Sequence, residues 1–154
     1  MKNSILVKKL SAEDMDAYIT YLKCAIEESP DMMWIDSVDE AALRARFADP
    51  FFQNTVSLVA FDGEHIIGRI EYHFYGCLQD GYRMAYVDWL YVLRRFRHNG
   101  VAQRLFEAFE AECRAHSIDQ YFLLCAENPE ADRFYGARQQ AELNHMPVLR
   151  KTLT

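Results

Sequence analysis

One stretch of the chain decides the fold: residues 86–102 read YVDWLYVLRRFRHNGVA. Its first half, up to Leu93, is almost entirely apolar and rich in aromatic and β-branched residues, which is typical of a buried strand. Its second half holds three arginines and then Gly100, after which an amphipathic helical pattern begins. The stretch therefore predicts a buried strand, a basic turn and a helix in direct succession.

Working outward, alternation and turn signals predict strands at 5–9, 55–61, 65–75, 84–93, 119–126 and 148–153. Helical periodicity predicts helices at 12–28, 39–48, 100–116 and 129–137. This order indicates an α/β class fold with a central mixed sheet flanked by helices. A crossover helix would join strands 84–93 and 119–126 in parallel. We expect a single domain over residues 1–154.

Composition excludes several classes of protein. A chain of 154 residues, 51% of them hydrophobic, can bury a core without metal or disulfide support. Its net charge of −6 disfavours nucleic-acid binding. The sequence has neither an apolar run of about 18 residues nor an apolar leader, which predicts no membrane association and no signal peptide. Four cysteines without metal-site spacing predict reduced, mostly buried thiols, no metal and a cytoplasmic location.

The turn before the third helix has the features of a pyrophosphate cradle. A helix that begins at Gly100 offers backbone N–H groups with partial positive charge. Small residues at Gly100 and Ala102 let a bulky anion approach the backbone closely. The basic residues around the turn are Arg94, Arg95, Arg97 and Arg104. The alternative is an ordinary solvated turn that is rich in arginine.

This stretch resembles the signature of the GNAT N-acetyltransferase superfamily. The spacing Arg97-x-x-Gly100-x-Ala102 matches the family pattern R/Q-x-x-G-x-G/A. The strand before it is similar to the family's central strand, which ends in Leu-x-Val before the loop. The further residues that match are Leu90, Val92, Asn128, Phe134 and Tyr135. The close resemblance covers about residues 84–136, and the order of the remaining elements also fits the family.

Two departures from the family pattern stand out. His98 directly follows Arg97, where the family often has glycine. The segment 136–147 lacks the Gly-Phe that often follows the family's tyrosine. The wall of the acceptor site near this segment is therefore the part that the resemblance predicts least.

The resemblance implies acetyl-CoA, or another acyl-CoA, as the donor, without a metal. By match of position, Leu90 and Val92 would pair with the pantetheine arm through their backbones, between strands that splay apart. The residues implied in cofactor binding are Leu90, Tyr91, Val92, Arg97, His98, Asn99, Gly100, Val101, Ala102 and Asn128. For Asn128, capping of the following short helix is an equally open alternative.

Two residues are predicted to carry the chemistry. Asp88 is the only charged residue between Met84 and Leu93, and strand alternation places it on the face of Leu90 and Val92. Burial there would suit it to general-base catalysis, directly or through water, whereas the alternative is a structural carboxylate. Tyr135 lies at the family's general-acid position, where it would protonate the departing thiolate; its alternative is packing beside Phe134.

Three other side chains have weaker claims to a catalytic role. His73 and Glu71 are reserve bases on the preceding strand, although a solvated or structural role is the alternative for both. Cys125 is expected to be an inert buried thiol, because no basic activator is adjacent.

Together these expectations describe direct transfer of an acetyl group to a primary amine of a small molecule or peptide. Acidic residues outnumber basic ones between residues 13 and 49, which favours a cationic acceptor or merely reflects solvated helix faces. An exposed edge strand would allow a homodimer. Two alternatives are a non-catalytic acyl-CoA-binding regulatory module on the same fold and a small-molecule sensor of an unrelated α/β fold.

Overall fold

The computed structural model describes residues 4–138 and 140–154. The chain forms two compact units, the first ending at Leu123 and the second beginning at Leu124. Within the described residues, no helix combines the length and apolar character needed to cross a membrane.

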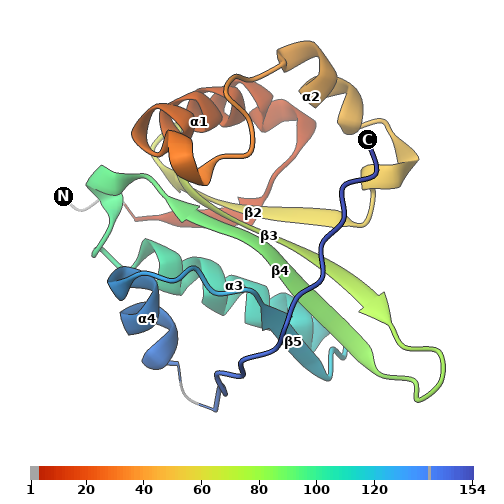
Figure 1. Cartoon of the computed structure of the whole chain (residues 1–154). Helices are drawn as coiled ribbons and strands as arrows, with labels where there is room; N and C mark the ends of the chain where they lie inside the picture. Colours follow the sequence, from red (N-terminus) through yellow and green to blue (C-terminus); the bar gives the residue numbers. More distant parts are fainter. Residues whose placement is uncertain (1–3, 139) are drawn as a thin grey trace. The chain divides into compact units, whose positions relative to one another are not determined.

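A five-stranded sheet forms the centre of the first unit (Figure 1). Its strands are β1 (Leu6–Lys9), β2 (Thr55–Asp62), β3 (His65–Gly76), β4 (Arg83–Val92) and β5 (Gln120–Leu123), which lie side by side in that order. The first four strands are antiparallel neighbours, and β5 is parallel to β4. The predicted mixed sheet and its single parallel pair are therefore confirmed.

Helices cover both faces of this sheet. The helices of the first unit are α1 (Met15–Glu28), α2 (Glu40–Arg46) and α3 (Val101–Ala115). Helix α1 packs on one face and α3 on the other (Figure 1). Short 3₁₀ turns at Ala12–Asp14, Pro30–Met32, Pro50–Phe52 and Arg94–Phe96 link these elements.

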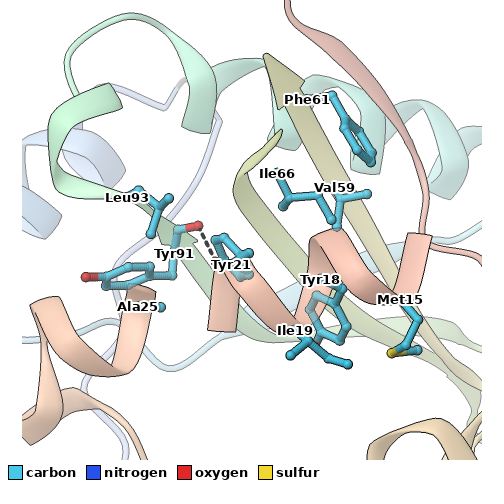
Figure 2. Packing of buried hydrophobic residues seen from close by; sticks show 10 residues of the cluster. All are labelled: Met15, Tyr18, Ile19, Tyr21, Ala25, Val59, Phe61, Ile66, Tyr91 and Leu93. Carbon is cyan, nitrogen blue, oxygen red and sulfur yellow. Dashed lines mark hydrogen bonds between the residues drawn. The ribbon is translucent and has the colours of Figure 1, made fainter. Parts of the chain in front are cut away.

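The buried core lies between the helices and the sheet. On the α1 side it contains Tyr18 and Tyr21 packed against Val59, and the Tyr21 hydroxyl donates a hydrogen bond of 2.9 Å to the Tyr91 carbonyl (Figure 2). On the α3 side, the rings of Tyr72 and Phe109 lie 4.8 Å apart. These contacts cover part of each face of β3 and β4, the strands that hold the candidate site.

The second unit contains helix α4 (Pro129–Gly136). The predicted strand at 148–153 is wrong, since residues 141–154 form neither helix nor strand. A strand is stabilised by a neighbouring ladder and by packing of one face, and local alternation cannot supply either one. The strand predicted at 119–126 is also shorter than expected, because β5 ends at Leu123.

Candidate active site

A β-bulge in β4 controls the direction of the predicted base. Glu71 lies opposite Trp89 and the next residue, Tyr72, lies opposite Val87, so Asp88 is the extra residue of the bulge. A bulge breaks the alternation of side chains along a strand. Asp88 consequently shares the face of Glu71 and His73, on the α1 side of the sheet.

The predictions that Asp88 is buried and shares a face with Leu90 and Val92 are therefore wrong. Val92 faces α3, because it and Val101 crowd the position of a Cβ at Gly68, at 3.2 and 3.1 Å. Leu90, two residues earlier on a regular part of the strand, faces the same way. The Asp88 side chain is 47% exposed and faces the opposite side of the sheet.

The bulge brings Asp88 into a polar cluster with two residues of β3. One ligand-type atom from each of Glu71, His73 and Asp88 lies within 4.8 Å of the others. The His73 Nε2 atom lies 3.6 Å from Asp88 Oδ2. Glu71 accepts hydrogen bonds of 2.6 Å from Arg69 and 2.9 Å from the Ser57 hydroxyl. Both reserve bases of the sequence thus lie beside the predicted base.

Arg69 belongs to this cluster, although no motif in the sequence predicts a role for it. The Arg69 side chain is buried at 9% exposure, and its guanidinium stacks on Tyr18 and Trp89 at 5.5 and 5.9 Å. A signal for it is present in the sequence, since Arg69, Glu71 and His73 occupy every second position of an apolar strand.

The end of β4 offers peptide groups at an edge. The pairing of β5 with β4 stops at Val87, opposite Leu123. On the other side, the Leu93 N–H donates to Ile67 O at 2.9 Å, and such donors alternate along an antiparallel ladder. Leu90 and Val92 therefore direct their peptide groups away from β3, toward the side on which β5 has ended.

This edge agrees with the strand splaying that the family resemblance implies, with one modification. The Val92 carbonyl already accepts a hydrogen bond of 2.9 Å from Arg97 Nε. Leu90 keeps both of its peptide groups directed to this side, whereas Val92 retains its N–H for a ligand. Tyr91, with its peptide groups directed toward β3, differs from both.

Hydrogen bonds to the end of α1 hold the turn after β4 in place. The Tyr91 hydroxyl lies 2.7 Å from the Ser29 hydroxyl, and it donates to Glu28 at 3.1 Å. The Arg94 N–H donates to the same Glu28 carboxylate at 2.9 Å. Tyr91 thus has a positioning role, because it ties the start of the basic turn to the end of α1.

The backbone of the turn leaves the N-terminus of α3 accessible. Gly100 precedes α3 with φ +77°, and a Cβ built on it would meet nothing within 4 Å. His98 also has a positive φ, +61°, and Asn99 donates to the Arg97 carbonyl at 3.1 Å. The first intrahelical donor is the Arg104 N–H, so the N–H groups of Val101 and Ala102 precede the helical ladder. This geometry fits a bound pyrophosphate.

The remaining predicted residues lie in the second unit. Asn128 caps α4, since its side chain accepts a hydrogen bond of 2.8 Å from the Ala131 N–H. Tyr135 is half-buried on α4, with its ring 5.2 Å from that of Phe134. Burial raises the pKa of Tyr135 to about 12; Cys125 adds to the rise and Arg138 opposes it. The phenol therefore carries its proton at neutral pH.

The prediction that Cys125 is buried is wrong, because this thiol is exposed and follows the end of β5. Partial desolvation and the nearby Asp132 raise the pKa of its thiol, which keeps it in the unreactive form. Of the four cysteines only Cys113 is buried. Cys24 and Cys77 are partly exposed, and Cys125 is exposed because it lies beyond the end of β5.

Several acids of the predicted acidic region have structural partners. Asp14, Asp16 and Glu40 form ion pairs with Lys8, Arg44 and Lys23. Asp39 and Asp49 cap the starts of α2 and the turn at Pro50–Phe52. The excess of negative charge on this side is therefore smaller than the sequence suggests.

A bulged central strand that extends beyond its parallel neighbour, followed by a basic turn and the N-terminus of a long helix, is the architecture of an acetyltransferase. The model of the Acetyltransferase (GNAT) family matches residues 17–139, and the chain belongs to this family. Its members use acetyl-CoA as co-substrate. The alternative of a sensor with an unrelated fold is thereby excluded.

Solved structures show the same fold at low sequence identity. An aminoglycoside acetyltransferase, meta-AAC0020, from an uncultured soil metagenomic sample has a TM-score of 0.81 at 16% identity, with 97% of each chain covered. A ribosomal-protein-alanine N-acetyltransferase from Brucella melitensis biovar Abortus 2308 has a TM-score of 0.74 at 17% identity, covering 97% of this chain and 100% of that one.

A glucosamine-6-phosphate N-acetyltransferase from Arabidopsis thaliana has a TM-score of 0.76 at 16% identity, covering 98% of this chain and 99% of that one. No curated protein sequence matches the chain. The three solved enzymes carry names with different acceptors, so the likeness defines the fold and leaves the acceptor to be argued from the site.

Proposed function

We propose that the chain transfers an acetyl group from acetyl-CoA directly to a primary amine within one ternary complex. The observation that carries this proposal is on β4, where one strand end combines peptide groups of Leu90 that point away from β3, beyond the end of the β5 pairing, with a cluster of acid–base side chains at the Asp88 bulge. An extended thioester arm can add to such an edge as an extra strand. The acyl group would then lie beside the cluster.

The binding part of the mechanism uses the turn and the strand edge. The pyrophosphate binds at residues 97–102, on the N–H groups at the start of α3, where the open space above Gly100 permits close approach. The pantetheine arm binds along Leu90 and the Val92 N–H. Asn128 keeps an amide N–H₂ beyond its capping bond, and this group binds the arm.

The chemical part of the mechanism is one attack and one departure. Asp88, directly or through a water, takes a proton from the amine, whose nitrogen attacks the thioester carbonyl. The backbone N–H of Leu90 polarises the carbonyl oxygen as negative charge develops there. The carbon–sulfur bond then breaks, and the Tyr135 hydroxyl protonates the thiolate. Holding both reactants in place supplies much of the rate acceleration.

We propose a cationic amine as the acceptor, such as an aminoglycoside-like compound, a polyamine or a lysine side chain. Support comes from further exposed acids around α1, in addition to those in ion pairs. They include Glu27, Asp31 and Asp36. The name of one structural relative, an aminoglycoside acetyltransferase, agrees with this choice. A negative field raises the encounter rate with cations.

The test is an assay of purified protein with acetyl-CoA and a panel of amines and peptides. We expect amine-dependent thiol release and a product heavier than the amine by one acetyl group. Binding of acetyl-CoA without transfer to any amine would instead favour the non-catalytic regulatory module. No binding of acetyl-CoA at all would contradict the whole proposal.

Three further features belong to this proposal. Residues 1–154 act as a single acetyltransferase domain, and the exposed edge strand β1 supports a homodimer. The free cysteines support a reducing, cytoplasmic location. Sedimentation at several concentrations measures the oligomeric state.

A further inference from the structure

We propose that His73 is a second catalytic residue and that it forms one general base together with Asp88. In this arrangement Asp88 receives the proton of the attacking amine and His73 holds it. The inference rests on the proposed acetyl transfer, and it adds the identity of the final acceptor of the amine proton.

The geometry places the imidazole of His73 beside the carboxylate of Asp88. His73 Nε2 lies 3.6 Å from Asp88 Oδ2, within ion-pair distance. On the other side of the ring, Nδ1 lies 3.4 Å from the Thr55 hydroxyl, and the ring stacks on Tyr86 with the planes 18° apart. The relay uses the tautomer in which Nδ1–H donates to Thr55, so that the Nε2 lone pair can accept a proton from protonated Asp88. The side chains of His73 and Asp88 are 34% and 47% exposed, so an amine can reach them.

The third member of the cluster is already committed to another partner. Arg69 donates to Glu71 at 2.6 Å and the Ser57 hydroxyl donates to the same oxygen at 2.9 Å. Both bonds end on one oxygen of Glu71, so this carboxylate is occupied by structural partners. Glu71 is therefore a structural carboxylate, and His73 is the neighbour of Asp88 that can take up a proton.

The same pairing argues against a metal at this cluster. A divalent cation bound by Glu71, His73 and Asp88 would lie close to the Arg69 guanidinium, which repels it. The proximity of the three residues is explained equally well by a proton-sharing pair of His73 and Asp88 beside a Glu71 that is bound to Arg69. A requirement for metal is nevertheless a distinct outcome of the test below.

The proton and electron balance of the step is simple. A proton leaves the amine nitrogen for Asp88, directly or through one water, as the nitrogen–carbon bond forms. The proton then passes to His73 Nε2 as a small rotation of the two side chains closes the 3.6 Å between them. The ion pair of imidazolium and Asp88 results. The carbon–sulfur bond breaks with its electrons on sulfur, Tyr135 protonates the thiolate, and solvent restores both side chains.

The test compares His73→Gln, Asp88→Asn and the double variant, with His65→Gln and Asp62→Asn as matched controls. His65 lies at the other end of β3 and Asp62 at the end of β2, so each control makes the same chemical change away from the cluster. We expect each single variant to lose about 10²-fold in kcat, with the affinity for acetyl-CoA unchanged. The controls should retain wild-type kcat.

The double variant separates a shared base from two independent groups. In the proposed relay the proton reaches His73 from Asp88, so the double variant should be no slower than Asp88→Asn alone. Losses that multiply would overturn the pair, as would wild-type kcat in His73→Gln. Loss of activity on treatment with a chelator, restored by a divalent metal, would overturn it in favour of a metal site.

Two measurements keep these outcomes distinct. Melting curves and acetyl-CoA titrations show that each variant is folded and binds the donor; His73→Asn serves as a second variant if His73→Gln is unstable. Failure of the wild-type protein to release thiol with any amine contradicts the proposed function itself. If the wild-type protein transfers acetyl groups but His73→Gln is equally active, only the role of His73 is contradicted, and the proposed function stands.

Discussion

Gly100 is the single residue at which backbone conformation and ligand approach coincide. We expect Gly100→Leu to abolish the rise in melting temperature that acetyl-CoA causes, because the side chain occupies the space above the pyrophosphate site. The positive φ itself costs about 1–2 kcal/mol for a non-glycine residue. Thermal melts with and without acetyl-CoA measure both effects.

Gly63→Leu is the matched control for this strain. Gly63 also has a positive φ, +61°, and open space around a built Cβ, but it lies in the β2–β3 hairpin. Both variants should be destabilised to a similar extent, and only the Gly63 variant should keep the ligand-induced shift. An intact shift in folded Gly100→Leu would remove the turn from the binding site.

The environment of Tyr135 predicts how the reaction rate depends on pH. With a pKa raised to about 12, its hydroxyl remains protonated well above neutral pH. We expect Tyr135→Phe to lower kcat by about 10²-fold at unchanged acetyl-CoA affinity, because only the departing thiolate uses the hydroxyl. The wild-type rate should show no alkaline fall due to this group below about pH 11, since an acid is lost only as pH rises through its pKa.

The control for this variant is Tyr75→Phe, which removes an exposed hydroxyl from β3. Rates measured under single-turnover conditions compare the two variants where chemistry limits turnover. Equal rates for the two variants would assign Tyr135 to packing beside Phe134.

At the scale of elements, the buried Arg69–Glu71 pair joins β3 to α1 and to the candidate site. We expect Arg69→Met to lower the free energy of unfolding by about 3 kcal/mol, since it leaves the Glu71 carboxylate half-buried without its partner. The double variant Arg69→Met/Glu71→Leu should recover most of this loss, because it removes the unpaired charge as well. Urea unfolding followed by circular dichroism measures the differences.

An ion pair on the protein surface provides the comparison. Lys9 of β1 pairs with Glu112 of α3 at 2.7 Å, and both side chains are solvent-accessible. Lys9→Met should therefore cost less than about 1 kcal/mol. Similar losses for Arg69→Met and Lys9→Met would mean that burial does not strengthen the Arg69–Glu71 pair.

For the whole molecule, the net charge of −6 and the exposed acids around α1 predict steering of a cationic acceptor. We expect kcat/KM for a cationic amine to fall about threefold or more between low and physiological salt, because ions screen the attraction. A neutral amine of the same size should show no such fall. Initial rates across a salt series measure both substrates.

A pair of charge variants locates the field. Asp31→Asn/Asp36→Asn should weaken the salt dependence, whereas Glu64→Gln/Glu107→Gln removes the same charge from exposed sites in the β2–β3 hairpin and on α3 and should leave it unchanged. Preference for the neutral amine would contradict the cationic acceptor class and leave the transfer chemistry intact.

The sequence by itself determined the order of the elements, the parallel pair of strands and the basic turn before α3. These features depend on local periodicity, on turn residues such as Asp62 and Gly63, and on one family signature around Gly100, all of which lie in short stretches of chain. The strand predicted from the sequence at residues 148–153 is absent, because strand propensity alone does not supply a neighbouring strand to pair with.

Only the tertiary structure decided what Asp88 faces. One extra residue in β4, set by its register with β3, turns this side chain from the face of Val92 to that of His73. It also decided that Arg69 holds Glu71, and that Arg97 occupies the Val92 carbonyl. Register and burial arise from contacts between distant residues, so an alternation rule applied to a single strand cannot predict them.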